Sequence, residues 1–182
     1  MDVVKLISNV LSNEDFNRLQ LHFKGHTAFD NILLDEFGRK LLGENTESIL
    51  TEFSNILLPI AKEVFNSDTL RPSNSLFAEY SGDTISLHKH TDANACTYTR
   101  DLVLYQDSPW GLWVNGVEYL ANENEAICFM GETSEHWRDT ITNNKNKIGA
   151  AFFHYVEPDH CFFDKGKEYV EVIRNNKREN GS

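Results

Sequence analysis

Apolar side chains in the first third of the chain repeat with the period of an α-helix. One apolar stripe is formed by residues spaced three or four apart, namely Ile49, Phe53, Ile56, Leu57, Ile60 and Val64. An earlier helix is indicated by Phe16, Leu19 and Phe23, which follow a Ser12 N-cap and acidic first-turn residues. Pro59 lies inside the second pattern and predicts a kink or a division of that helix. We therefore expect residues 1–70 to form a helical support.

After Arg71-Pro72 the pattern changes to short segments rich in aromatic and β-branched residues, separated by Gly, Asn and Asp. These segments predict strands at Leu76–Tyr80, Ile85–His90, Tyr98–Tyr105, Leu112–Val114, Val117–Leu120, Ala126–Phe129, Trp137–Ile141 and Ile148–Val156. Asn115-Gly116 stands between two short runs and is the strongest hairpin signal in the chain. The order of elements predicts a mainly β fold with N-terminal helices, a cupin-like jelly roll or double-stranded β-helix.

The size of the chain favours one domain. It has 182 residues, of which 40% are hydrophobic, and this is about the amount of sequence that builds a single core. No internal repeat or long linker interrupts it. We expect a single domain over residues 1–182, with a jelly-roll core at residues 75–157.

Charge and cysteine content restrict the partners and the compartment. The 17 basic and 28 acidic residues give a formal net charge of −11, which disfavours nucleic acid and anionic membranes as partners. No apolar run approaches the roughly 20 residues of a membrane span, and Asp2 and Lys5 are unlike a signal peptide. The three cysteines have no CxxC spacing, as is usual in a reducing compartment. A cytoplasmic protein acting on a small-molecule or peptide substrate is expected; the oligomeric state is not predicted.

Three residues have the spacing of a metal site. His90 and Asp92 are two residues apart at the end of a predicted strand, so their side chains share a face, and His136 follows a buried run further along the chain. Two imidazoles and one carboxylate on one face of an octahedron leave three positions open. This is the arrangement of non-haem Fe(II) oxygenases.

With Tyr80 ten residues before His90, residues 75–157 resemble the 2-oxoglutarate- and Fe(II)-dependent dioxygenases, in particular their prolyl-hydroxylase-like branch. The resemblance implies His90, Asp92 and His136 as iron ligands. It also implies Tyr80 as a hydrogen-bond donor to the distal carboxylate of 2-oxoglutarate, and Tyr105 as an aromatic residue lining the co-substrate pocket.

The same resemblance implies Fe(II), 2-oxoglutarate and O₂ as cofactors, and an enzyme that hydroxylates a peptidyl, amino-acid or small-metabolite substrate with release of succinate and CO₂. The family pairs the distal carboxylate with a basic residue on the strand after the second histidine. Lys147 is the best match here, while Lys145 and Arg138 remain open alternatives. A lysine would act as a point charge, without the two-pronged geometry of arginine.

Two other functions remain open. Gly82, His88 and His90 reproduce the front half of a cupin motif, so a cupin-type metalloenzyme could use His88, His90 and His136, although the glutamate of that motif is absent. In this alternative, His88 and His90 share a face of the strand by alternation. The remaining alternative is a catalytically silent jelly-roll binding module.

Overall fold

The computed structural model describes residues 3–24, 26, 34–35, 37–44, 47–142, 145 and 147–165. Its elements, in chain order, are β1 (Lys5–Ser8), α1 (Asn13–Phe23), β2 (Arg39–Gly43), α2 (Ser48–Phe65), β3 (Arg71–Tyr80), β4 (Thr84–His90), the 3-10 turn η2 (Asn94–Cys96), β5 (Tyr98–Gln106), β6 (Leu112–Val114), β7 (Val117–Tyr119), β8 (Glu125–Phe129), β9 (His136–Thr142), β10 (Ile148–Val156) and α3 (Phe162–Lys165).

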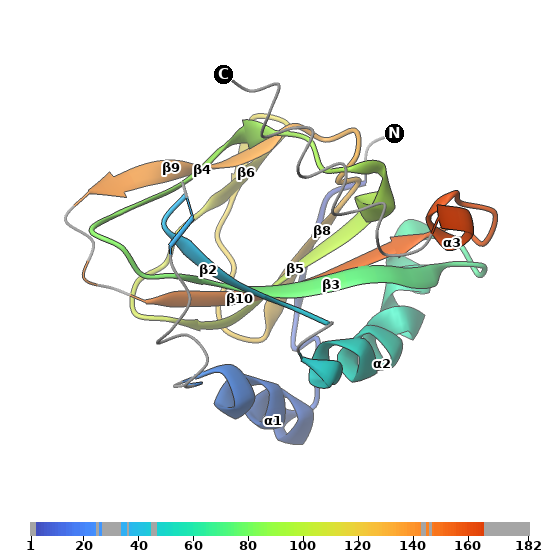
Figure 1. The fold of residues 1–182 in the computed structure, drawn as a ribbon, viewed down its shortest axis with the longest axis horizontal. Helices are drawn as coiled ribbons and strands as arrows, with labels where there is room; N and C mark the ends of the chain where they lie inside the picture. The colour runs from blue at the N-terminus through green and yellow to red at the C-terminus, as the bar shows by residue number, and fades with distance from the viewer. Residues whose placement is uncertain are drawn as a thin grey trace.

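The strands form two antiparallel sheets. Within the described residues, the large sheet has the order β1-β8-β5-β10-β3-β2 and the small sheet has the order β4-β9-β6-β7. In Figure 1, α1 and α2 lie beneath the large sheet, and β4, β6 and β9 lie on its other side. The fold is therefore mainly β, with helices covering the outer face of the large sheet and the small sheet facing its inner face.

Apolar clusters hold these layers together. Between the helices and the large sheet, Phe23 of α1 stacks on Phe77 of β3 with ring centroids 4.1 Å apart, and both side chains are fully buried. Between the sheets, Leu87 and Leu112 of the small sheet pack with Val103 and Phe129 of the large one. Because the large sheet is covered on both faces, nearly all of β10 is buried.

Helix α1 begins where the sequence indicates, but Pro59 does not divide α2. Ser12 Oγ accepts a hydrogen bond from the Asp15 amide at 3.1 Å, as expected of an N-cap. Helix α2 is assigned without a break from Ser48 to Phe65, so the predicted division is wrong. Burial of Leu57 and Ala61 on either side of the proline stabilises the continuous helix against the local loss of a backbone hydrogen bond. Among the described residues, the helices are too short or too polar to form a membrane span.

All eight predicted strands are present: two have the predicted bounds, five have ends shifted by one residue, and β3 begins five residues early. The helical prediction for the first third is incomplete, because β1 and β2 lie there as the two edges of the large sheet. Strand β1 pairs with β8, where Lys5 lies opposite Cys128. Short edge strands paired with distant segments leave little local pattern, which is why the sequence did not reveal them.

Candidate metal centre

Strands β4 and β9 bring the three predicted ligands together at one end of the space between the sheets. His90 ends β4 and lies opposite His136, which begins β9. Asp92 follows β4, and its amide donates to the Gly131 carbonyl at 2.8 Å. One ligand atom from each of His90, Asp92 and His136 lies within 4.8 Å of the other two. The structure therefore unites the three residues that the spacing predicted.

Both imidazoles are oriented by backbone carbonyls. His90 Nδ1 lies 2.6 Å from the His88 carbonyl oxygen, and His136 Nδ1 lies 3.0 Å from that of Ser134. A carbonyl oxygen can only accept, so each Nδ1 carries the hydrogen. The Nε2 atoms face Asp92 Oδ1 at 3.7 Å from His90 and 3.5 Å from His136. In this tautomer the Nε2 lone pairs are available to a metal ion.

The other carboxylate oxygen of Asp92, Oδ2, is held by a hydrogen bond. Thr99 Oγ1 donates to Asp92 Oδ2 at 3.0 Å and also lies 3.1 Å from His154 Nδ1. Burial alone would raise the pKa of the Asp92 carboxyl, but the neighbouring histidines, His136 first, outweigh burial and hold that pKa well below its usual range. Asp92 is therefore a carboxylate at neutral pH, with Oδ1 turned toward both imidazoles.

The two histidines differ in their electrostatic surroundings. Burial lowers the pKa of His136, but Asp92 outweighs burial and leaves that pKa above its usual value. Burial and the neighbouring His136 lower the pKa of His90. Asp92 thus interacts most strongly with His136. A divalent cation bound at this site would contact the Asp92 carboxylate and both imidazole rings.

Gly131 supports this arrangement by having no side chain. A Cβ atom at this position would collide with Asp92 Oδ2, Thr99 Oγ1 and the Cys96 carbonyl. We expect Gly131→Ala to displace Asp92 and to weaken Fe(II) binding about 10–100-fold, as losses in the shell around metal ligands do. Competition titration measures the affinity, and Gly43→Ala, whose Cβ would meet no atom within 4 Å, is the matched control. Unchanged affinity in Gly131→Ala would show that Asp92 does not depend on this contact.

A second polar group consists of Arg138, two residues after His136 on β9, and Asp101, two residues after Thr99 on β5. The Arg138 side chain lies on the same face of β9 as His136. Its Nη2 pairs with Asp101 Oδ2 at 2.6 Å, and its Nη1 donates to the Trp110 carbonyl at 2.5 Å. Both members of the pair are buried, with Arg138 4% and Asp101 1% exposed. Within the described residues, Arg138 Nε and Asp101 Oδ1 have no hydrogen-bond partner.

Tyr80 joins this group from β3. Its ring meets that of Trp110 edge-on with centroids 4.9 Å apart, and within the described part of the chain its buried hydroxyl has no hydrogen-bond partner. Burial raises the pKa of Tyr80, while the charges of Arg39 and Arg138 oppose that rise. Buried polar groups are seldom left without partners. Tyr80 and Arg138 therefore have donor capacity for a ligand between the sheets.

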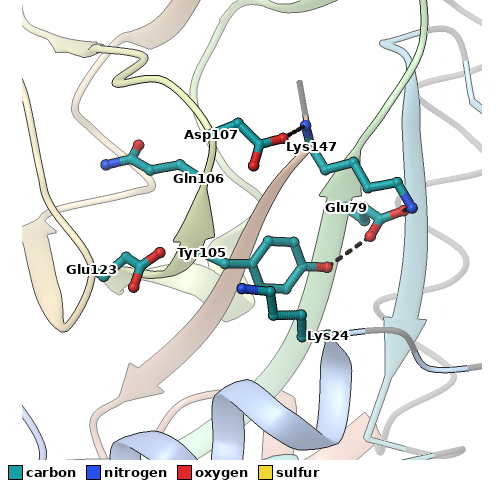
Figure 2. A pocket seen from close by; sticks show the side chains of 7 residues that line it. All are labelled: Lys24, Glu79, Tyr105, Gln106, Asp107, Glu123 and Lys147. Atoms are coloured by element: carbon teal, nitrogen blue, oxygen red, sulfur yellow. Dashed lines mark hydrogen bonds and ion pairs between the residues drawn. The ribbon is translucent and has the colours of Figure 1, made fainter. Parts of the chain in front are cut away.

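Tyr105 and Lys147 lie on the opposite face of the large sheet. The Tyr105 hydroxyl donates to Glu79 Oε2 at 2.7 Å, and Lys147 Nζ is 3.9 Å from Glu79 Oε1. Glu79 is next to Tyr80 on β3, so its side chain projects from the other face. Figure 2 shows these three side chains beside Lys24 at the end of α1, in a pocket of about 170 Å³.

Of the three basic candidates, Arg138 lies on β9 two residues after His136, on the same face as that ligand. The Lys147 side chain is 66% exposed, and Lys145 is exposed in the connection between β9 and β10. The structure brings Tyr80 and Arg138 toward the triad. It does not bring Tyr105 or Lys147 there.

His88 does not share a face with His90, so the expectation from strand alternation is wrong. Between its pairings with Arg138 and His136, β4 advances three residues, from Leu87 to His90, while β9 advances two. This β-bulge interrupts the alternation. The exposed His88 ring packs against Phe37 with centroids 4.7 Å apart. The cupin ligand set His88, His90 and His136 is therefore not assembled in the structure.

Sequence reasoning missed the residues that support the site, chiefly Thr99 and Gly131 beside Asp92, and Asp101 beside Arg138. A signal for two of them was present. Thr99 and Asp101 are polar, buried and two residues apart on β5, so they share a face, while Arg100 between them donates to the Leu57 carbonyl of α2. Polar residues that alternate on a buried strand indicate a polar site on one of its faces.

Solved structures share this fold. No protein-family model matches the sequence. No curated protein matches it significantly. The epimerase SnoN in complex with Fe³⁺, alpha ketoglutarate and nogalamycin RO has a TM-score of 0.69 at 10% identity, over 91% of this chain and 86% of SnoN. EctD from S. alaskensis with bound Fe has a TM-score of 0.66 at 12% identity, over 86% and 73% of the two chains.

A prolyl-4-hydroxylase from Pseudomonas putida has a TM-score of 0.59 at 13% identity, over 85% of this chain and 92% of the hydroxylase. At these identities the likeness concerns the fold. The matching proteins include an epimerase as well as a hydroxylase, so the comparison does not single out the prolyl-hydroxylase-like branch.

Proposed function

We propose that this chain is an Fe(II)- and 2-oxoglutarate-dependent oxygenase, built as one double-stranded β-helix domain over residues 1–182. The carrying observation is the convergence of His90, Asp92 and His136, with both Nδ1 atoms engaged by carbonyls and both Nε2 atoms facing Asp92. Proteins that share the fold were crystallised with iron and with 2-oxoglutarate, which supports the proposal.

The donor set fits ferrous iron. Two neutral imidazoles and one carboxylate occupy three positions and leave three for a chelating co-substrate and O₂. When bound, Fe(II) with 2-oxoglutarate and O₂ would supply the oxidising chemistry that couples release of succinate and CO₂ to hydroxylation of a peptidyl, amino-acid or small-metabolite substrate. The protein's residues hold the ligands in place: carbonyls fix the rings, and Thr99 fixes Asp92.

Arg138 and Tyr80 are the proposed partners of the distal carboxylate of 2-oxoglutarate. Arg138 lies two residues beyond His136, a separation of about 7 Å along a strand, which suits a five-carbon diacid that reaches from the metal. Arginine has five N–H donors, and the described contacts leave Nε without a partner. Because Lys147 and Tyr105 project from the other face of the sheet, we assign neither of them to the co-substrate.

The function is tested by succinate release. Purified protein is supplied with ferrous iron, 2-oxoglutarate and pools of peptides or amino acids, and succinate is measured with and without each component. Succinate that requires both iron and 2-oxoglutarate is expected. If the protein binds one iron ion and one 2-oxoglutarate per chain but releases no succinate with any pool, it is instead a silent binding module.

A further inference from the structure

A second group of metal-binding side chains lies on the helical face of the large sheet and shares no residue with the triad. His22 Nε2 is 2.7 Å from Glu47 Oε2, and His26 Nε2 is 3.5 Å from Glu47 Oε1. One ligand atom from each residue lies within 4.8 Å of the other two. The group joins the end of α1 to the residue that precedes α2, and the two helices lie side by side where Arg18 pairs with Glu52 (Figure 1).

The core supports these side chains. Phe23, which is fully buried, meets the His22 ring edge-on at 4.9 Å between centroids and stacks with the His26 ring at 6.3 Å. The His26 amide donates to the Phe23 carbonyl at 3.1 Å. The backbone of Glu47 is also fixed, since its amide donates to the Gly43 carbonyl at 3.0 Å. All three candidate ligands are therefore anchored by backbone or core contacts.

The Glu47 carboxylate is more buried than the carboxylates of ordinary surface ion pairs. The Glu47 side chain is 11% exposed, against 34% for His22 and 21% for His26. A largely buried carboxylate approached by two imidazoles has lost most of its water and needs a partner of positive charge. A metal ion bound by all three residues would meet that need.

The donor types fit zinc. His22 lies in the last turn of α1 and His26 follows the helix, and their ring centroids are 5.2 Å apart, so both can bind one ion. Zinc bonds of about 2.0–2.1 Å in a tetrahedron separate the ligand atoms by roughly 3.4 Å. The 3.5 Å between His26 Nε2 and Glu47 Oε1 suits such an edge. The 2.7 Å between His22 Nε2 and Glu47 Oε2 is a hydrogen-bond distance, and it would lengthen when the ion binds. Two nitrogen donors and one oxygen favour zinc over Ca²⁺ or Mg²⁺, which prefer oxygen.

We propose that His22, His26 and Glu47 bind one Zn²⁺ ion, with water in the fourth position. The ion links α1 to the start of α2. Because it binds the assembled residues of the folded chain, it stabilises the native state. This proposal does not depend on the oxygenase function, since the two sites lie on opposite faces of the large sheet.

The test uses the full chain carrying Asp92→Ala and His136→Ala, which removes the triad. After chelator treatment this protein is titrated with Zn²⁺ by calorimetry, and its thermal unfolding is followed with and without the metal. We expect one zinc ion per chain and a higher unfolding temperature with zinc. Adding either His22→Gln or Glu47→Gln should weaken zinc binding at least about 100-fold, because even losses around metal ligands cost about 10–100-fold.

His160→Gln is the matched control, because His160 is a described histidine outside the cluster whose Nδ1 accepts from the Phe162 amide. It should leave zinc affinity and the thermal shift unchanged. The proposal is overturned if the folded triad-deleted chain, checked by circular dichroism, binds no zinc. It is equally overturned if His22→Gln and Glu47→Gln both bind zinc as tightly as their parent. The first of these outcomes needs no substitution in the cluster, so a misfolded variant cannot hide it.

Discussion

Replacing His136 or Asp92 with alanine is expected to abolish stoichiometric iron binding and 2-oxoglutarate-dependent succinate release. Either change leaves two of three ligands, and the loss of one ligand should exceed the about 10–100-fold cost of losing a supporting residue. His136 is only 4% exposed, so water cannot readily replace its imidazole. Iron content after anaerobic reconstitution, with succinate release on the same samples, measures the effect.

The matched control for this prediction is His88→Ala. His88 is exposed and packs against Phe37, outside the group of ligand atoms. His88→Ala should keep stoichiometric iron and succinate release. Any loss should be moderate, because the backbone carbonyl of residue 88, which orients His90, is retained. Full iron retention in both His136→Ala and Asp92→Ala would refute the triad. Loss of iron in His88→Ala with retention in Asp92→Ala would establish the cupin ligand set instead.

Removing the charge of Arg138 is expected to raise the KM for 2-oxoglutarate about 10- to 150-fold. A hydrogen bond to a charged group contributes about 1.5–3 kcal/mol, and this converts to that range. Arg138→Met alone would leave Asp101 buried without its partner, which costs about 3–5 kcal/mol of stability. The variant to use is therefore Arg138→Met with Asp101→Asn. Its KM is compared with that of Asp101→Asn alone, and thermal unfolding shows that both proteins are folded.

Lys147→Met is the contrasting variant. Its side chain is 66% exposed and lies near Glu79 on the other face of the sheet, so its KM should stay within about twofold of wild type, as expected for an exposed ion pair. Tyr80→Phe should have a smaller effect than loss of Arg138, because a neutral hydrogen bond contributes only about 0.5–1.5 kcal/mol. A large KM increase in Lys147→Met, with a normal KM in the Arg138 variant, would return the carboxylate to Lys147.

The amino-acid sequence by itself indicated the two longer helices, eight of the strands and the three candidate ligands of the first metal site. Short segments rich in aromatic and β-branched residues located eight strands, and Asn115-Gly116 identified the hairpin between β6 and β7. Both residues have positive φ, 50° and 81°, which a two-residue hairpin turn requires. The sequence could place His90 and Asp92 on one face, because the directions of side chains two residues apart at a strand end depend on the local backbone.

Only the tertiary structure decided which face of each strand points inward. Alternation places Lys147 and Ile148 on opposite faces, but packing of the two sheets makes the face of Ile148 the inner one. The bulge in β4 was equally hidden, because it arises from pairing with β9, and it turned His88 away from the site.

Long-range pairing decided the rest. Strands β1 and β2 form only by pairing with β8 and β3, and the contact between His22 and Glu47 joins α1 to the residue that precedes α2. The period of a sequence fixes which side chains share a face, since that follows from the backbone geometry of one segment. What each face meets depends on segments far apart in the chain, and their contacts form only when the layers pack together.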